Sequence, residues 1–151
     1  MAKPGVGDHA PGFDLPGSGG RRYALDDFAG TGAVLAFYPG DFTLVCTKQF
    51  CSYRDANERV EKLSMPLLGI SPQSVATHER FIKEKHLTVP LLADEDKSVA
   101  HAYGVLAPGG FVRRAIFVID GELTVRYRDV KLLGLSFESI EDIEQALASV
   151  A

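Results

Sequence analysis

The sequence predicts an α/β fold in which helices flank a mixed central sheet and a hairpin extends the sheet at its N-terminal end. Three continuous apolar runs, residues 33–38, 67–71 and 115–119, are typical of strands covered on both faces. Helical patterns alternate with these runs, which favours parallel strand connections. The pair Asp120-Gly121 follows the third run and is a hairpin signal, so part of the sheet should be antiparallel.

Turn and capping signals define the other elements. The glycine-rich residues 17–20 predict the turn of the N-terminal hairpin, between short strands at 13–15 and 22–24. Ser74 is a candidate N-cap for a helix that ends near residue 85. The remaining predicted segments are a helical turn at 25–28, a helix at 44–63, a short strand at 89–92, a helix at 94–103, an edge strand at 123–128 and a helix at 139–148.

Length and charge limit the class of protein. The 151 residues are enough for one domain, which we expect to span residues 1–151. The net charge of −4 argues against nucleic-acid or anionic-membrane partners, because both reward clustered Lys and Arg. No apolar run is long enough to span a bilayer, and residues 1–8 lack the apolar core of a signal peptide. We therefore expect a cytoplasmic location with no membrane partner, where cysteines are more often redox-active or metal-binding than statically bridged.

The chain has two cysteines, and both follow the first buried strand. Cys46 lies at the predicted start of a helix, after a turn that carries Pro39 and Thr43, and Cys51 comes five residues later. The first N–H groups of a helix have no partner within the helix, and the helix dipole places partial positive charge there. Both effects favour thiolate over thiol, and the thiolate is the reactive form.

The spacing of the two cysteines restricts how they can react together. Five helical steps separate the Cα atoms of Cys46 and Cys51 by roughly 8–9 Å, whereas a disulfide needs them within about 7 Å. Either the pair never bonds, or the first turns of the helix unwind when it does. We favour a redox switch coupled to local unwinding.

Three other interpretations compete for these cysteines. They can be small buried apolar residues. They can bind zinc, but the spacing is unusual for a zinc pair and the four histidines are scattered singly. They can act as a C-x-x-C oxidoreductase pair, but four residues separate them instead of two. We therefore expect no metal site.

The turn itself carries a family resemblance. The pattern Pro39-x-x-x-Thr43-x-x-Cys46 resembles the active-site signature of peroxiredoxins. The stretch that begins Arg114-x-x-Phe117 resembles the second motif of that family, and the similarity covers nearly the whole chain. Within the family, Cys46-Thr47-x-Gln49-x-Cys51 followed by Arg54-Asp55 is similar to the bacterioferritin-comigratory-protein, or peroxiredoxin Q, branch.

The resemblance implies a fold and a reaction. The fold is thioredoxin-like with an N-terminal hairpin, and the activity is reduction of hydrogen peroxide and organic hydroperoxides. The family pattern makes Cys46 the peroxidatic cysteine, oxidised to sulfenic acid, and Cys51 the resolving cysteine. A thioredoxin- or glutaredoxin-like partner would then reduce the intramolecular disulfide, and no cofactor or metal is implied.

Three further residues receive roles by this comparison. The Thr43 hydroxyl would align the thiolate and the peroxide. Pro39 has no N–H and a fixed φ, so it would shape and shield the pocket. Arg113 and Arg114 point to opposite faces at the start of a strand, and the family motif selects Arg114 to stabilise the thiolate and the leaving oxygen.

Some alternatives stay open at this point. Residues 41–46 resemble typical two-cysteine peroxiredoxins more than the peroxiredoxin Q branch, yet the C-terminal cysteine of those enzymes is absent from the sequence. The chain can instead be a one-cysteine enzyme resolved by an external thiol, a non-catalytic peroxide sensor or holdase, or a protein disulfide reductase. The sequence allows a monomer or a weak homodimer that pairs near Phe42.

Overall fold

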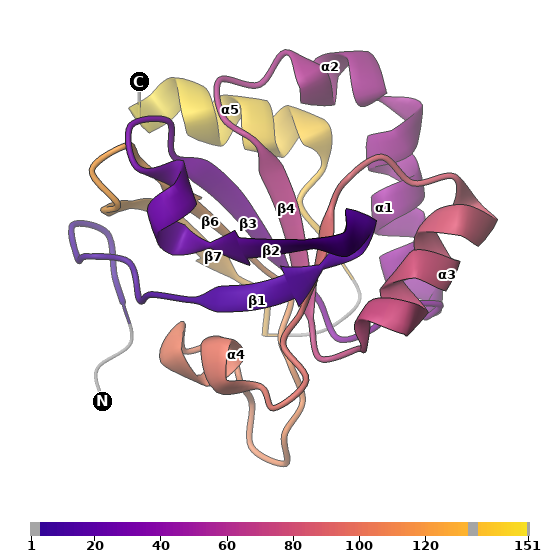
Figure 1. The fold of residues 1–151 in the computed structure, drawn as a ribbon. Coiled ribbons are helices and arrows are strands. Elements are labelled where there is room, and N and C mark those ends of the chain that lie inside the picture. Colours follow the sequence, from indigo (N-terminus) through magenta and orange to yellow (C-terminus); the bar gives the residue numbers. More distant parts are fainter. Residues whose placement is uncertain (1–3, 133–135, 151) are drawn as a thin grey trace.

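The computed structural model describes residues 4–132 and 136–150. Over those residues, seven strands form one mixed sheet with the order β2-β1-β5-β4-β3-β6-β7 (Figure 1). The strands are β1 (Asp14–Gly17), β2 (Arg21–Ala24), β3 (Ala33–Phe37), β4 (Leu67–Ser71), β5 (Leu91–Ala93), β6 (Ala115–Ile119) and β7 (Val125–Val130). The helices are α1 (Leu44–Asp55), α2 (Asn57–Glu61), α3 (Val75–Lys85), α4 (Ser98–Ala102) and α5 (Ile140–Val150).

The centre of the sheet is parallel and its edges are antiparallel. Strand β3 pairs in parallel with β4 and antiparallel with β6, and β4 pairs in parallel with β5. The hairpin β1–β2 extends one edge, and β7 forms the other. The predicted mixed sheet, N-terminal hairpin and edge strand are therefore confirmed.

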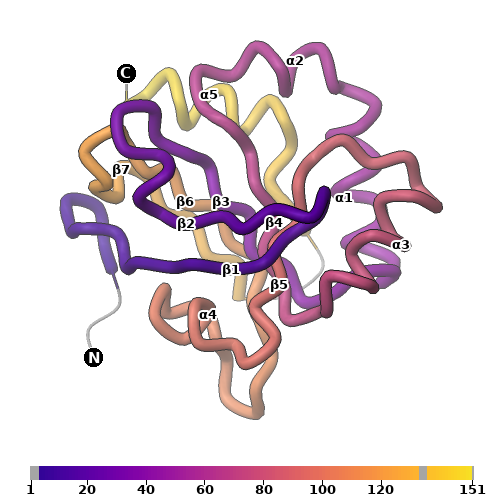
Figure 2. The backbone as a smooth tube through the Cα atoms, in the orientation of Figure 1, coloured from indigo at the N-terminus to yellow at the C-terminus, as the bar shows by residue number. Residues whose placement is uncertain are grey.

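Helices cover both faces of the sheet. The apolar sides of α1, α3 and α5 pack on one face, where Phe50, Phe81 and Ile143 join a single buried cluster. The other face is covered by α4 and by the segment before β1, through residues such as Val99 and Phe13. Figure 2 shows the chain passing from this N-terminal segment along β1 before it enters the central strands. All of β3 is buried, so the loop after it is anchored on a rigid base.

The prediction of one continuous helix at 44–63 is wrong. Helix α1 ends at Asp55, Ala56 leaves helical geometry with φ −103° and ψ 27°, and α2 begins at Asn57. The apolar spacing continues across this break, because Val60 and Leu63 still pack against the same buried cluster. Periodicity alone therefore missed the change of direction.

The predicted helix at 94–103 is also too long. Only Ser98–Ala102 is helical, because Lys97 adopts a left-handed conformation with φ 63°. The buried Asp94 carboxylate accepts hydrogen bonds from the Val99 and Ala100 N–H groups, at 3.1 and 2.8 Å. Asp94 thus caps the helix from a distance instead of forming part of it.

Within residues 4–132 and 136–150, no helix is both long and apolar enough to cross a membrane.

The close packing of α1 on β4 predicts a stability effect at Gly69. A Cβ atom at this position would lie 2.7 Å from Leu91 Cδ2 and 3.0 Å from the Phe50 ring. Overpacking of this kind costs about 1–3 kcal/mol. We expect Gly69→Ala to lower the free energy of unfolding by that amount in urea titrations. Gly12→Ala, with open space around it, is the control, and equal stability of the two variants would contradict this packing.

Candidate active site

The turn after β3 positions the first turn of helix α1. Thr43 is the N-cap of the helix, and its Oγ1 accepts a hydrogen bond from the Cys46 N–H at 3.3 Å. The same hydroxyl donates to the Gly40 carbonyl at 3.2 Å. An N-cap of this type contributes about 1 kcal/mol to helix stability. Thr43 therefore joins the turn to the residue that carries the thiol.

The two cysteines lie on one helix, as the helical pattern predicted. Cys46 has no exposed surface and packs in a cluster with Tyr38 and Phe50. Cys51 is half-buried, and both thiols are free. Five residues of intact helix keep their Cα atoms about 8–9 Å apart. The folded helix thus holds the pair too far apart for a disulfide.

Arg114, and not Arg113, lies buried beneath the helix. Arg114 is 3% exposed and donates from Nη1 to Gln49 Oε1 at 2.9 Å, whereas Arg113 is half-exposed. Gln49 lies one helical turn after Cys46, so the guanidinium reaches the same stretch of α1. Pro39 is half-buried directly after Tyr38. Pro39, Thr43 and Cys46 thus lie along the turn after β3 and the first turn of α1, and Arg114 contacts Gln49 of the same helix.

A directional hydrogen-bond chain continues from Arg114. Gln49 Nε2 donates to the Tyr53 hydroxyl at 3.1 Å, and that hydroxyl donates to the Glu138 carbonyl at 2.6 Å. Burial raises the pKa of Tyr53 well above its usual value, so the hydroxyl keeps the proton that it donates. Each end of the Gln49 amide therefore has one partner of the correct polarity.

Gln49 is buried, which sequence reasoning missed. The buried residues of α1 are Cys46, Gln49, Phe50 and Tyr53. Their spacing of i, i+3, i+4 and i+7 marks one helix face. That periodicity was the available signal, and it places Gln49 on the buried side.

A second polar group, also missed, lies in the turn itself. The Asp41 carboxylate is buried, accepts from the Tyr38 hydroxyl at 2.7 Å and lies 2.6 Å from His78 Nδ1. Burial, and then the nearby Asp41, raises the pKa of Tyr38 well above its usual value. No short sequence pattern predicts this contact, because Asp41 and His78 are 37 residues apart.

Phe42 adopts an unusual backbone conformation between Asp41 and Thr43. Its φ of 63° is in the left-handed region, which costs roughly 1–2 kcal/mol for a residue with a side chain. Its side chain is 40% exposed and packs against the Phe81 ring with a centroid distance of 5.0 Å. Phe42 is thus partly exposed, whereas Tyr38 is buried.

Comparison with known proteins decides the family. The model of the AhpC/TSA family matches residues 6–128. The chain belongs to the AhpC/TSA family. Peroxiredoxin Bcp of Bacillus subtilis (strain 168) is 34% identical over 149 residues, which cover 92% of this chain and 94% of the relative. Chloroplastic peroxiredoxin Q of Oryza sativa subsp. japonica is 38% identical over 123 residues, covering 80% of this chain and 57% of the relative, so the match spans little more than half of the plant protein.

Solved structures of AhpC/TSA proteins share the fold. Peroxidoxin BcpB from Mycobacterium tuberculosis superposes with a TM-score of 0.81 at 29% identity, over 97% of this chain and 96% of that chain. Peroxiredoxin Q from Xanthomonas campestris gives a TM-score of 0.78 at 26% identity, over 91% and 89%. The predicted thioredoxin-like fold and the resemblance to the Bcp and peroxiredoxin Q branch are confirmed.

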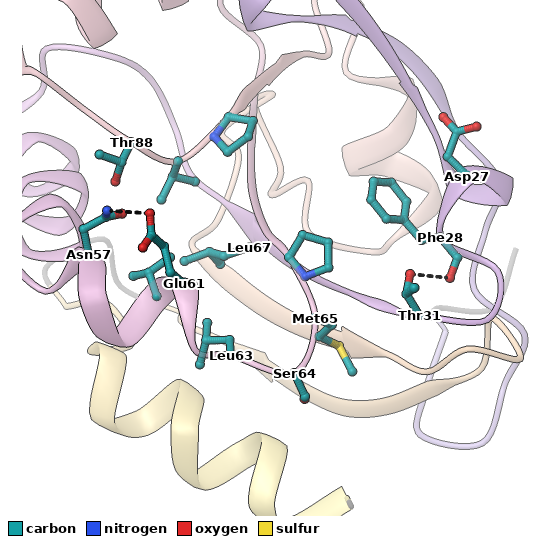
Figure 3. A pocket seen from close by; sticks show the side chains of 14 residues that line it. Asp27, Phe28, Thr31, Asn57, Glu61, Leu63, Ser64, Met65, Leu67 and Thr88 are labelled. Carbon is teal, nitrogen blue, oxygen red and sulfur yellow. Dashed lines mark hydrogen bonds between the residues drawn. The ribbon is translucent and has the colours of Figure 1, made fainter.

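A cavity of about 750 Å³ lies elsewhere on this AhpC/TSA domain. Its lining includes Phe28, Asn57, Leu63, Met65 and Pro90 (Figure 3). These residues precede β3, β4 and β5 or belong to α2, so the cavity lies at the amino ends of the parallel strands. The cysteine turn follows the carboxyl end of β3, and the cavity is therefore separate from it.

No metal centre accompanies the cysteine turn in the part of the chain that the structure describes. Among residues 4–132 and 136–150, no group of three or more His, Cys, Asp or Glu side chains is arranged to hold a metal ion.

The Arg114–Gln49 contact predicts an effect on both activity and stability. Gln49→Leu removes the Oε1 acceptor at 2.9 Å from Arg114 and the donor to Tyr53. We expect the free energy of unfolding to fall by about 1–3 kcal/mol. We also expect the second-order rate constant with peroxide to fall about 10- to 100-fold, because displaced reacting groups cost rates of this size. Lys48→Leu, on the exposed side of α1, should change neither quantity; equal effects of the two variants would refute this role.

The carboxyl of Glu138 predicts a pH effect on stability. Burial, and then the neighbouring Asp129, raises its pKa from 4.5 to about 7. Between these values the folded chain holds a proton that the unfolded chain releases, so the free energy of unfolding should fall as pH rises from about 4.5 to 7. We expect the decline to be on the order of 2 kcal/mol in urea titrations at several pH values. Glu138→Gln, which cannot titrate at this position, should remove it. The control is Glu95→Gln, at an exposed site, which should keep the decline. If the free energy of unfolding of Glu138→Gln fell as steeply with pH as that of Glu95→Gln, this assignment would be contradicted.

Proposed function

We propose that this chain, a thiol-dependent peroxidase by its family, uses Cys46 as the peroxidatic cysteine and Cys51 as the resolving cysteine. The supporting observation is that Cys46 lies in the Thr43-capped first turn of α1, where N–H groups that have no acceptor within the helix, together with the helix dipole, stabilise negative charge. Cys51 is the other free thiol, on the same helix.

The proposed reaction has three balanced steps. The Cys46 thiolate attacks one peroxide oxygen, the O–O bond breaks, and the other oxygen leaves as water or an alcohol after it takes up a proton. The sulfur becomes a sulfenic acid. The Cys51 thiol then displaces the sulfenic oxygen as water and forms a disulfide with Cys46. An external dithiol of the thioredoxin or glutaredoxin type reduces that disulfide and is itself oxidised.

The neighbouring residues have distinct roles in this proposal. The Arg114 guanidinium stabilises negative charge on the thiolate and on the leaving oxygen. The Thr43 hydroxyl, already in contact with the Cys46 N–H, aligns the sulfur and the peroxide. Pro39 offers no N–H donor and limits water near the turn.

Resolution requires part of the helix to unwind. The Thr43–Cys46 cap must break, and residues 46–51 must leave helical geometry before the sulfurs can meet. Gln49 lies between the two cysteines, so its contact with Arg114 is also strained or lost in the disulfide form. The intramolecular disulfide and the buried Arg114–Gln49 bond therefore belong to alternative states.

The surface around the turn supports a protein reductant. Phe42 and Leu44 flank Thr43 and are 40% and 73% exposed, an apolar surface of the type that protein partners use. We propose a monomer or a weak homodimer that pairs at this surface. A cytoplasmic location fits the cycle, because that compartment supplies reducing dithiols.

Cysteine variants test the cycle. With a thioredoxin system and hydrogen peroxide, Cys46→Ser should lose turnover by at least about a thousandfold, because the nucleophile is removed. Cys51→Ser should consume about one equivalent of peroxide at a normal rate and then stop with the reductant unused. Steady turnover of Cys46→Ser would refute the mechanism, whereas full turnover of Cys51→Ser would show a one-cysteine enzyme.

A further inference from the structure

The turn before Cys46 is anchored from outside helix α1. The Asp41 carboxylate is 6% exposed. One of its oxygens accepts from the Tyr38 hydroxyl at 2.7 Å, and the other lies 2.6 Å from His78 Nδ1. His78 Nε2 lies 3.0 Å from the Leu92 carbonyl. Asp41 is therefore tied to the end of β3, to α3 and, through His78, to β5.

The hydrogen-bond partners of His78 define where its ring protons lie. The Leu92 carbonyl can only accept, so His78 Nε2 carries a proton and donates it. A single proton then lies between His78 Nδ1 and the Asp41 oxygen. Moving Asp41 away would leave a buried carboxyl group and a buried imidazole without these partners, which is strongly unfavourable. Asp41 is thus the fixed end of the turn.

The next residue is held much less firmly. Phe42 has the left-handed φ of 63° and a side chain that is 40% exposed. Its ring is held against α3 by the Phe81 ring at 5.0 Å and by the Arg80 guanidinium at 6.0 Å. A strained, half-exposed residue beside a fixed one is the natural pivot for a local opening.

We propose that His78, Arg80 and Phe81 of α3 form a latch that holds the Thr43 cap closed, and that α1 unwinds by pivoting at Phe42 when these contacts loosen. This inference rests on the proposed function, because a latch matters only where Cys46 must move to reach Cys51. His78 is a positioning residue here and does not touch the peroxide. Weakening the latch should open residues 43–47 more often and speed disulfide formation.

Two variants weaken the latch, one at the exposed Arg80 and one at the buried His78. Arg80 is exposed, so Arg80→Ala removes only the contact with the Phe42 ring. His78→Asn keeps a donor near the Nδ1 position facing Asp41 and loses the bond to Leu92. Glu84→Ala, an exposed site on the same helix, is the matched control.

Amide hydrogen exchange of the reduced protein measures the opening directly. We expect exchange at residues 43–47 to rise about two- to fivefold in Arg80→Ala and about tenfold in His78→Asn, with exchange in β4 and β6 unchanged. Unchanged exchange at 43–47 in both variants, relative to Glu84→Ala, would overturn the latch. A uniform rise across the sheet would also overturn it, because that result means global destabilisation.

Rapid-quench intact mass measurements connect the opening to the chemistry. After one equivalent of hydrogen peroxide, the conversion of the oxygen adduct into the disulfide should accelerate by the same factors as exchange. Faster exchange with an unchanged conversion rate would overturn the gating role of α3. If even the unsubstituted protein forms no disulfide, Cys51 does not resolve Cys46 and the gating role falls with it, while the exchange data still decide whether α3 holds the turn.

Discussion

The start of helix α1 at Leu44 is the constraint on which the rest of the site depends. Because the helix begins there, Thr43 caps it, Cys46 lies in its first turn and Cys51 lies five residues further along. The same geometry that places Cys46 at the positive end of the helix dipole keeps the second thiol out of bonding distance. In the proposed cycle, an intact helix therefore suits the oxidation of Cys46 and opposes its resolution by Cys51.

Two buried polar groups hold this helix start from opposite sides. On the sheet side, the chain from Arg114 through Gln49 and Tyr53 ends at the Glu138 carbonyl, just before α5. On the α3 side, Asp41 is bonded to Tyr38 and His78. Buried polar groups that have their partners fix one arrangement, because any shift leaves donors or acceptors unpaired. These contacts fix Asp41 before Cys46 and Gln49 after it.

Local signals in the sequence were enough for most of the fold. The continuous apolar runs located β3, β4 and β6 because a strand buried on both faces needs apolar residues throughout. The hairpin signal at Asp120-Gly121 correctly indicated an antiparallel edge. The helix break at Ala56 was not predictable from periodicity, since Val60 and Leu63 continue the apolar spacing beyond it. The shortening of α4 depends on the side chain of Asp94 capping a helix that starts four residues later.

The candidate site also has one part that local sequence patterns predict and another that only the folded chain determines. Pro39, Thr43 and Cys46 form a local pattern that a sequence displays directly. Helical periodicity is sufficient to place Gln49 on the buried face. The pairing of Asp41 with His78 depends on the packing of α3 against the turn, and that is a property of the folded chain and not of any short segment.

The central claim is that α1 must unwind so that Cys51 can resolve Cys46 within one chain. The most direct test is the intact mass of the reduced protein, followed over seconds after one equivalent of hydrogen peroxide. The account predicts a monomer that has lost two hydrogens and retains no added oxygen. A persistent single added oxygen would contradict it, because the sulfenic acid would then be waiting for an external thiol.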